Sequence, residues 1–258
     1  LKTIMDQNFL NRGFTDVFDV QIDEELTQLS KLIYSETKPF LVDHDESISL
    51  QQKLNLNFKE IPDTDTWSKL MEKVNNSNEL NTLINCNGIK NSFQKIFDNP
   101  KIFSISTFRA RLPSQKRVIY NWHQDEGTWY LSKNKNQINK YPATLWFSIN
   151  GANIEDSIQL ISFSHKQKLH HHTLVKGQGY FNINKKILED KNNITTISTK
   201  PSQGVIFQPL TIHRSVPPTK ISLRPRYTID IRYYDDEFKK NYKVDFAFKA
   251  KKLLKKIF

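Results

Sequence analysis

The sequence has very little cysteine: Cys86 is the only one among 258 residues. A single cysteine excludes an intramolecular disulfide framework and favours a reducing, cytoplasmic location. No apolar run reaches the roughly 18 residues that a membrane-spanning helix needs. The first residues, LKTIMDQNFL, lack an apolar centre of the signal-peptide type. We therefore expect a cytoplasmic protein without a transmembrane segment.

The charge is basic and unevenly distributed. The formal net charge is +11, and residues 239–258 contain eight lysines but only one acidic residue, Asp245. Lysines and apolar residues are mixed there, which predicts a basic C-terminal helix over 236–258. Its apolar side either packs on the protein, which we favour, or lies on an anionic membrane surface. Lys, Asn and Ile are all abundant, which is the pattern that codon bias in an AT-rich genome produces. Because this bias can account for the positive charge, no nucleic-acid partner is expected.

The first hundred residues are expected to be mainly helical. Apolar residues at helical spacing predict a helix over 24–36, with Asp23 as its N-cap. Further short helices are predicted near the start of the chain, around Trp67–Val74, after Ser77 and over 91–97. Residues 37–65 are polar and are read mostly as loop.

The pattern changes after Pro100, where short stretches alternate as strands do. They cover 101–111, 116–123, 143–150, 157–163, 204–208, 211–216 and 226–234. Many short strands without helices between them indicate an antiparallel sandwich or jelly roll. We therefore predict a mainly β (α+β) chain with one domain over 1–258, in which a helical part (1–100) packs on a jelly-roll core (101–235).

A His-x-Asp pair, His123 and Asp125, lies in the stretch YNWHQDEGTWY at 120–130. On a strand, residues i and i+2 point to the same face, so the imidazole and the carboxylate would converge. These are two of the three ligands in the 2-His-1-carboxylate set that holds non-haem Fe(II). The pair alone is a weak signal, because chance also produces it.

The third ligand must be a histidine from elsewhere, and His213 fits best because it ends an apolar strand. The other histidines are read as exposed or structural: His44 in a polar loop, His165 at a strand end, and 170–172 in a solvated loop. Three protein ligands would leave positions on the metal for cosubstrate and oxygen.

Arginines follow the third ligand. Arg224, Arg226 and Arg232 share one face if the strand is regular. A guanidinium there can hold a carboxylate with two hydrogen bonds, as an iron-bound dicarboxylate would need at its far end. Ser215, two residues after His213, could add a hydroxyl to the same carboxylate.

These motifs, taken in order, resemble the phytanoyl-CoA dioxygenase-like family of Fe(II)/2-oxoglutarate oxygenases over most of residues 7–235. The resemblance is carried by Trp122-His-Gln-Asp125, Ala143-Thr-Leu-Trp146, Ser164-His-Lys166, Gly204-Val-Ile-Phe207, His213-Arg-Ser215 and Arg224-Pro-Arg226. The chain departs from the family pattern at three places: Phe163 replaces a glycine, the family's Asn-Gly is replaced near Glu155-Asp156, and Val205 replaces an aspartate.

The resemblance implies a double-stranded β-helix, cupin-like core and an enzyme that uses Fe(II), 2-oxoglutarate and O2. It implies hydroxylation of an unactivated C–H bond in a small molecule, with release of succinate and CO2. His123, Asp125 and His213 would bind the metal, and Arg226, in preference to Arg224, would anchor 2-oxoglutarate. The presence of the carboxylate argues against halogenation.

Several nearby residues are candidates for contacts with the bound molecules. Thr144 and Trp146, on a strand that could face the interior, are candidates for cosubstrate contact, although Trp146 could equally belong to the core. The expected substrate contacts are Trp129, Tyr130, Gln124 and Arg109.

The substrate class stays open among sugars, nucleotide sugars, amino acids and acyl derivatives, and the charge favours an anionic one. Two other functions remain: a related oxygenase that desaturates, epimerises or cyclises, and a non-catalytic jelly-roll binding module. The complete His-Asp-His set argues against the latter.

Overall fold

The computed structural model describes residues 6–97, 101–112, 121–129, 143–167, 169–174, 181–183, 193–217 and 224–234. The predicted basic helix over 236–258 and most of the predicted strand over 116–123 lie outside these residues.

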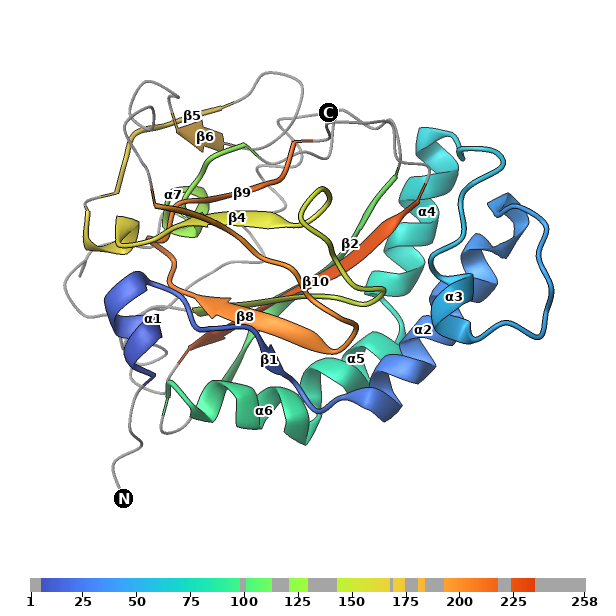
Figure 1. The fold of residues 1–258 in the computed structure, drawn as a ribbon, viewed down its shortest axis with the longest axis horizontal. Coiled ribbons are helices and arrows are strands. Elements are labelled where there is room, and N and C mark those ends of the chain that lie inside the picture. Colours follow the sequence, from blue (N-terminus) through green and yellow to red (C-terminus); the bar gives the residue numbers. More distant parts are fainter. Residues whose placement is uncertain are drawn as a thin grey trace.

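The larger of two facing sheets has five antiparallel strands in the order β1-β8-β3-β10-β2 (Figure 1). They are, in that order, Phe18–Asp19, Gln203–Phe207, Ala143–Ser148, Arg226–Tyr234 and Lys101–Arg111. The smaller sheet has the order β7-β4-β9, which is Ile194–Thr196, Ile158–Ile161 and His213–Ser215. A third pair joins β5 (His172–Leu174) to β6 (Phe181–Ile183).

The chain winds back and forth between the two main sheets. After β2, the chain reaches the smaller sheet at His123. An isolated antiparallel bridge joins His123 to His213, the first residue of β9. The path then runs from β3 in the larger sheet to β4 and β7 in the smaller one, back to β8, across to β9 and back to β10. This winding is a jelly roll, so the predicted double-stranded β-helix core is confirmed.

Strand β10 has one apolar side and one polar side. Tyr227, Ile229, Ile231 and Tyr233 are fully buried and belong to the large apolar core that the helices share. Successive strand residues point to opposite faces. The residues between them, Arg226, Thr228, Asp230 and Arg232, therefore face the smaller sheet, and the space between the sheets is polar along β10.

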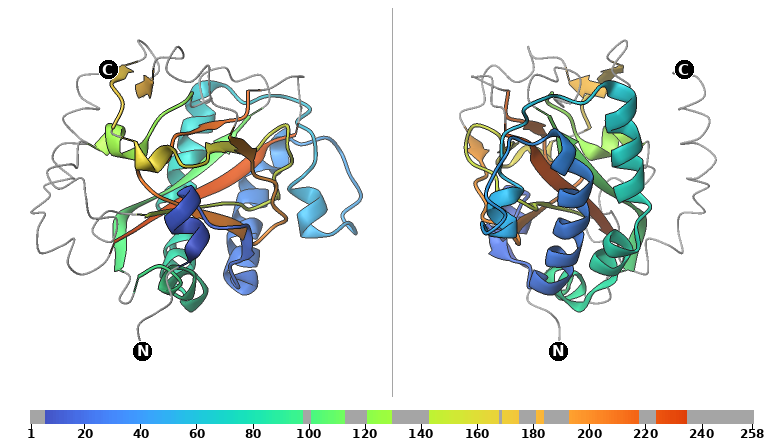
Figure 2. Two further views of the ribbon diagram at one scale, coloured as in Figure 1. Left: turned by 60° about the vertical axis from the view of Figure 1, so that its left-hand side comes forward. Right: turned by 90° about the vertical axis from the view of Figure 1, so that its right-hand side faces the viewer.

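Helices cover the apolar face of the larger sheet (Figures 1 and 2). They are α2 (Asp23–Thr37), α4 (Thr64–Asn75), α5 (Asn78–Asn85) and α6 (Asn87–Gln94). Phe9 of α1 (Gln7–Arg12) joins the same core, while α3 (Leu50–Lys53) and a 3-10 turn at Lys38–Phe40 pack against α2. Phe93 of α6 stacks on Tyr233 of β10 with ring centroids 3.7 Å apart. The described part of the first hundred residues is mainly helical, and Ser77, one of two caps expected there beside Asn78, is the N-cap of α5.

Three details of the helices differ from the prediction. Ile22, not Asp23, is the N-cap of α2, and Asp23 begins the acidic first turn, where its charge favours the helix dipole. Helix α6 begins at Asn87 rather than Asn91. The region 37–65, read mostly as loop, contains the short helix α3. A capping box between Ser49 and Gln52 stabilises the start of this helix.

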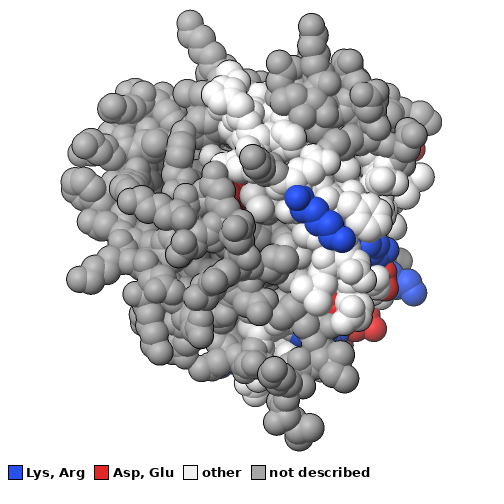
Figure 3. All heavy atoms as spheres, turned by 90° about the vertical axis from the view of Figure 1, so that its left-hand side faces the viewer, with Lys and Arg blue, Asp and Glu red and all other residues white. Residues whose placement is uncertain are grey.

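No helix within the described residues is long and apolar enough to cross a membrane. On the face shown in Figure 3, the described Lys and Arg side chains lie among uncharged and acidic residues. The described part of this face therefore carries no continuous basic patch.

Gly88 provides a test of how closely α6 approaches the β1 segment. A Cβ at this position would overlap the carbonyl oxygens of Val20 and Gln21. Alanine normally favours a helix over glycine by about 1 kcal/mol. Here we expect Gly88→Ala to lower the free energy of unfolding by about 1–3 kcal/mol, because the backbone must move apart. Urea unfolding measures this change.

The matched control is Asn91→Ala at an exposed position of the same helix. Asn91→Ala should leave stability unchanged or raise it slightly. An increase in stability for Gly88→Ala would contradict the close approach.

Candidate metal centre

Three buried side chains from two distant parts of the chain meet between the sheets. His123, Asp125 and His213 each offer a ligand atom, and these atoms all lie within 4.8 Å of one another. The predicted ligand set therefore comes together. The predicted strand does not: the chain leaves the sheet after His123, and Asp125 is the first residue of a short helix, α7 (Asp125–Trp129). A turn, rather than i/i+2 alternation, brings the carboxylate to the imidazoles.

The two imidazoles are oriented by the backbone. His123 donates from Nδ1 to the Asn121 carbonyl oxygen at 2.7 Å, and His213 donates from Nδ1 to Thr211 at 2.9 Å. Each ring thus carries a proton on Nδ1, and each Nε2 atom faces the Asp125 carboxylate, where it could bind a metal. Burial, followed by repulsion from His213, lowers the pKa of His123 to about 3. The neutral ring that metal binding requires is therefore the form present at neutral pH.

The carboxylate of Asp125 faces both imidazoles with one oxygen. Its Oδ1 lies 3.8 Å from Nε2 of His123 and 3.7 Å from Nε2 of His213. Its Oδ2 accepts a hydrogen bond from Thr144 Oγ1 at 2.7 Å and is 3.3 Å from Arg232 Nη2. Burial opposes ionisation of Asp125, but Arg232 and the two histidines together lower the pKa of this carboxyl below its usual range. The carboxylate is therefore ionised and ready to bind a cation.

Arg226 lies at the opposite end of β10 from Arg232 and is buried. Its Nη1 donates to the carbonyl oxygens of Asp156 and Ser157. The Ser157 carbonyl also accepts from the backbone N–H of Val216, the residue after Ser215. The Arg226 guanidinium therefore lies beside the chain segment that follows Ser215.

A second arginine, Arg111 of β2, is the cross-strand partner of Arg226 and donates to the Val216 carbonyl. Burial, followed by repulsion from Arg111, lowers the pKa of Arg226 to about 10, so it stays charged at neutral pH. Neither Arg226 Nε nor Ser157 Oγ has a hydrogen-bond partner among the described residues. Two buried cations, with unused donors on Arg226 and Ser157, fit an anionic group.

The other two cosubstrate candidates, Arg224 and Trp146, have different surroundings. Arg224 is partly exposed and donates from Nη2 to the carbonyls of Asn150 and Gly151. Trp146 is buried in an apolar cluster between the sheets, beside residues such as Leu160 and Phe207. Trp146 therefore has the surroundings of a core residue, which is one of the two interpretations given above.

Gln124 is not available for substrate. Its side chain is fully buried, donates from Nε2 to the Leu210 carbonyl and accepts from the backbone N–H of His170. Its own backbone N–H donates to Nε2 of His172. The predicted substrate contact is therefore wrong: Gln124 ties the metal-ligand segment to two other segments.

The expected solvated loop over 170–172 is also wrong for one residue. His172 is half-buried and donates from Nδ1 to the His170 carbonyl, which leaves Nε2 to accept from Gln124. A Cβ on Gly127 would overlap its ring. Consecutive histidines suggested only a polar loop, and no sequence signal marked this contact.

The remaining predicted residues have these positions. Arg109 pairs with Asp230 of β10, with Nε 2.7 Å from Oδ2. Trp129 ends α7, but its side chain and all of Tyr130 lie outside the described residues. His165 is buried and bonds to the Leu10 carbonyl, as expected for a structural residue.

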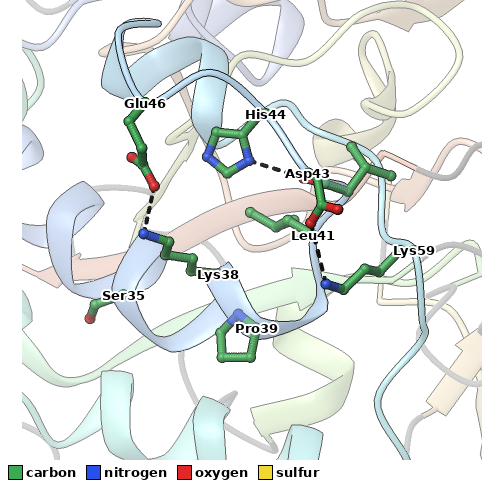
Figure 4. Close-up of a pocket in the computed structure, with 9 residues that line it drawn as sticks. Ser35, Lys38, Pro39, Leu41, Asp43, His44, Glu46 and Lys59 are labelled. Carbon is green, nitrogen blue, oxygen red and sulfur yellow. Dashed lines mark hydrogen bonds and ion pairs between the residues drawn. The ribbon is translucent and has the colours of Figure 1, made fainter.

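His44, expected to be exposed, is half-buried against Tyr34 and lines a surface hollow of about 430 Å³ (Figure 4). The charged residues that line this hollow form ion pairs with one another, Lys38 with Glu46 and Lys59 with Asp43. None of the three metal-ligand candidates lines it. The buried centre, not this hollow, is the candidate site.

Comparison with known proteins gives structural likeness only. No protein-family model and no curated protein matches the chain. Solved structures match its fold. ThoJ, a non-haem monooxygenase, has a TM-score of 0.56 and 15% identity, covering 89% of this chain and 76% of ThoJ. EvdO2 from Micromonospora carbonacea var. aurantiaca, complexed with 2-oxoglutarate, has a TM-score of 0.54 and 11% identity, and the match covers 88% of each chain.

EctD from S. alaskensis, with 2-oxoglutarate and 5-hydroxyectoine, has a TM-score of 0.58 and 14% identity, covering 89% of this chain and 74% of EctD. At these identities the likeness establishes the shared fold. The metal centre described above is therefore argued from the residues of this chain.

Replacing Gln124 tests its structural role. Gln124→Ala leaves the His170 N–H and the Leu210 carbonyl without their partner in a buried place. We expect the free energy of unfolding to fall by about 1–3 kcal/mol. The measurement is urea unfolding of the metal-free protein. His171→Ala, at an exposed neighbouring position, is the control and should have no effect. Unchanged stability in Gln124→Ala would return Gln124 to the substrate candidates.

Proposed function

We propose that this chain is an Fe(II)/2-oxoglutarate-dependent oxygenase that hydroxylates an unactivated C–H bond of a small metabolite. The observation that carries the proposal is the buried convergence of His123, Asp125 and His213, with both Nε2 atoms directed to one carboxylate oxygen. Two histidines and one carboxylate with further positions left open are the ligand set of non-haem Fe(II) oxygenases.

The fold likeness supports the same assignment. EvdO2 is complexed with 2-oxoglutarate, and EctD has structures with bound Fe and with 2-oxoglutarate. When bound, Fe(II) with 2-oxoglutarate and O2 supplies the oxidation: the substrate C–H becomes C–OH while 2-oxoglutarate becomes succinate and CO2. The narrower resemblance to the phytanoyl-CoA dioxygenase-like family stays a prediction.

The protein's own residues would bind and orient these groups. His123, Asp125 and His213 would hold the metal, with the imidazoles kept in one tautomer by the Asn121 and Thr211 carbonyls. Placing the three ligands between two sheets keeps water away from the metal except at the open positions.

Arg226, together with Ser215, would hold the far carboxylate of 2-oxoglutarate. Support comes from the unused Nε of Arg226, from the Ser157 carbonyl that Arg226 shares with the backbone N–H of Val216, and from the second buried cation, Arg111. The far carboxylate would offset part of the charge of these two guanidiniums and supply the missing hydrogen-bond acceptor. Arg224, partly exposed and bonded to the 150–151 turn, is the second candidate.

The first test is an anaerobic titration of the protein with Fe(II) and 2-oxoglutarate. The wild type should show the weak visible band of the Fe(II)–2-oxoglutarate complex, and Asp125→Ala should lose it because the only carboxylate ligand is gone. His171→Ala, with an exposed side chain, should keep the band. Absence of the band in folded wild-type protein overturns the proposal.

The second test separates the two anchor candidates. Arg226→Ala should raise the 2-oxoglutarate concentration needed for half-maximal band formation by about tenfold or more, because a charge-assisted, buried contact is lost. Arg224→Ala, as the matched control, should change it by less than about threefold. The reverse order would assign the anchor to Arg224.

A further inference from the structure

The two oxygens of the Asp125 carboxylate have different surroundings. Oδ1 is the atom nearest to the two Nε2 atoms, at 3.8 and 3.7 Å. Oδ2 accepts the 2.7 Å hydrogen bond from Thr144 and lies 3.3 Å from Arg232 Nη2, which is 3.5 Å from Oδ1. One oxygen is thus turned toward the metal site, and the other is held by protein donors.

The two donors are fixed by the sheet. Thr144 of β3 and Arg232 of β10 are direct cross-strand partners. Opposite residues on neighbouring antiparallel strands have Cβ atoms about 4.5–5.5 Å apart on the same face, so their side chains act at one place. Both residues are buried, and the pairing of β10 with β2 is irregular between Ile231 and Tyr233, around Arg232. Irregular pairing of this kind often redirects a side chain beside a functional site.

The arrangement decides how many positions a metal keeps for other molecules. A carboxylate can bind a metal through one oxygen or through both. With two histidines on an octahedral ion, one-oxygen binding leaves three positions open, whereas two-oxygen binding leaves two. A bidentate cosubstrate needs two positions and oxygen needs one more, so binding through both oxygens of Asp125 would leave no place for oxygen.

We propose that Thr144 and Arg232 are positioning residues that occupy Oδ2 of Asp125, so that the carboxylate binds the metal through Oδ1 alone and three positions stay open. The inference rests on the proposed metal-dependent function and extends it to two residues outside the ligand set. Thr144, considered above for direct cosubstrate contact, acts here through the ligand.

The experiment counts water molecules on bound Mn²⁺, which carboxylate, imidazole and water ligands suit. The wild type, titrated with Mn²⁺ alone and measured by ¹⁷O water relaxation, should hold three exchangeable waters. Thr144→Val removes the shortest contact to Oδ2 while nearly keeping the volume. It should hold two waters and bind Mn²⁺ about tenfold more weakly, as loss of an outer-shell partner commonly does. Thr144→Ser keeps the hydroxyl and should match the wild type.

Arg232→Gln should lower the number of bound waters and the Mn²⁺ affinity, as Thr144→Val does. If Arg232→Gln does not fold, the near-isosteric Thr144→Val decides alone. Three waters and unchanged affinity in Thr144→Val, beside a wild type that binds Mn²⁺ with three waters, overturn this inference and leave the proposed function standing. A folded wild type that binds neither Mn²⁺ nor Fe(II) overturns both.

Discussion

The centre of this protein depends on one antiparallel backbone bridge. His123 donates to the His213 carbonyl at 3.0 Å, and His213 donates back to His123 at 2.9 Å. This pair of bonds aligns two segments that are far apart in the chain and brings the two imidazole ring centroids within 4.1 Å. The carboxylate ligand, the Gln124 contacts and the β5 segment are all arranged around it. Hydrogen bonds of this kind are individually worth only about 1 kcal/mol, so the surrounding sheets must hold the bridge in register.

The two faces of the larger sheet have different surroundings. Its apolar face joins the helices in one continuous core, in which Phe108 and Tyr233 contribute large buried rings. On the face toward the smaller sheet, β3 and β8 contribute apolar residues, whereas β2 and β10 contribute arginines. Arg232 is placed at the metal end of β10 and Arg226 at the other, six residues away along an extended strand. The Arg226 guanidinium bonds to the Ser157 carbonyl, and Ser157 is three residues, or about 10 Å, from Leu160, the β4 residue that pairs with His213. The interior therefore has two positively charged ends, one directed at the ligand carboxylate and the other at a space with unused donors.

Much of the fold could be predicted because its signals are local. Helical spacing located α2, α4 and α5, and alternation located β2, β3, β4, β8, β9 and β10 with small errors at the ends. The ligand set could also be predicted, since few histidines are available and His213 fitted best as the third ligand. The geometry of Asp125 could not: a five-residue helix begins there, and so short a segment has no periodicity to detect. Gln124 and His172 were misread for a related reason, because their partners come from segments 46 and 48 residues away.

The sequence by itself determined the types of residue that meet at this site: two histidines, one aspartate, a serine two residues after the second histidine, and arginines on the following strand. It also determined the jelly-roll class, since alternation and turn chemistry act within a few residues. Only the tertiary structure decided which oxygen of Asp125 faces the imidazoles, which arginine pairs with it and which polar side chains are already satisfied. Those outcomes depend on the register between β3 and β10 and on the His123–His213 bridge. Register depends on how whole strands pack together, and no single stretch of the chain contains that information.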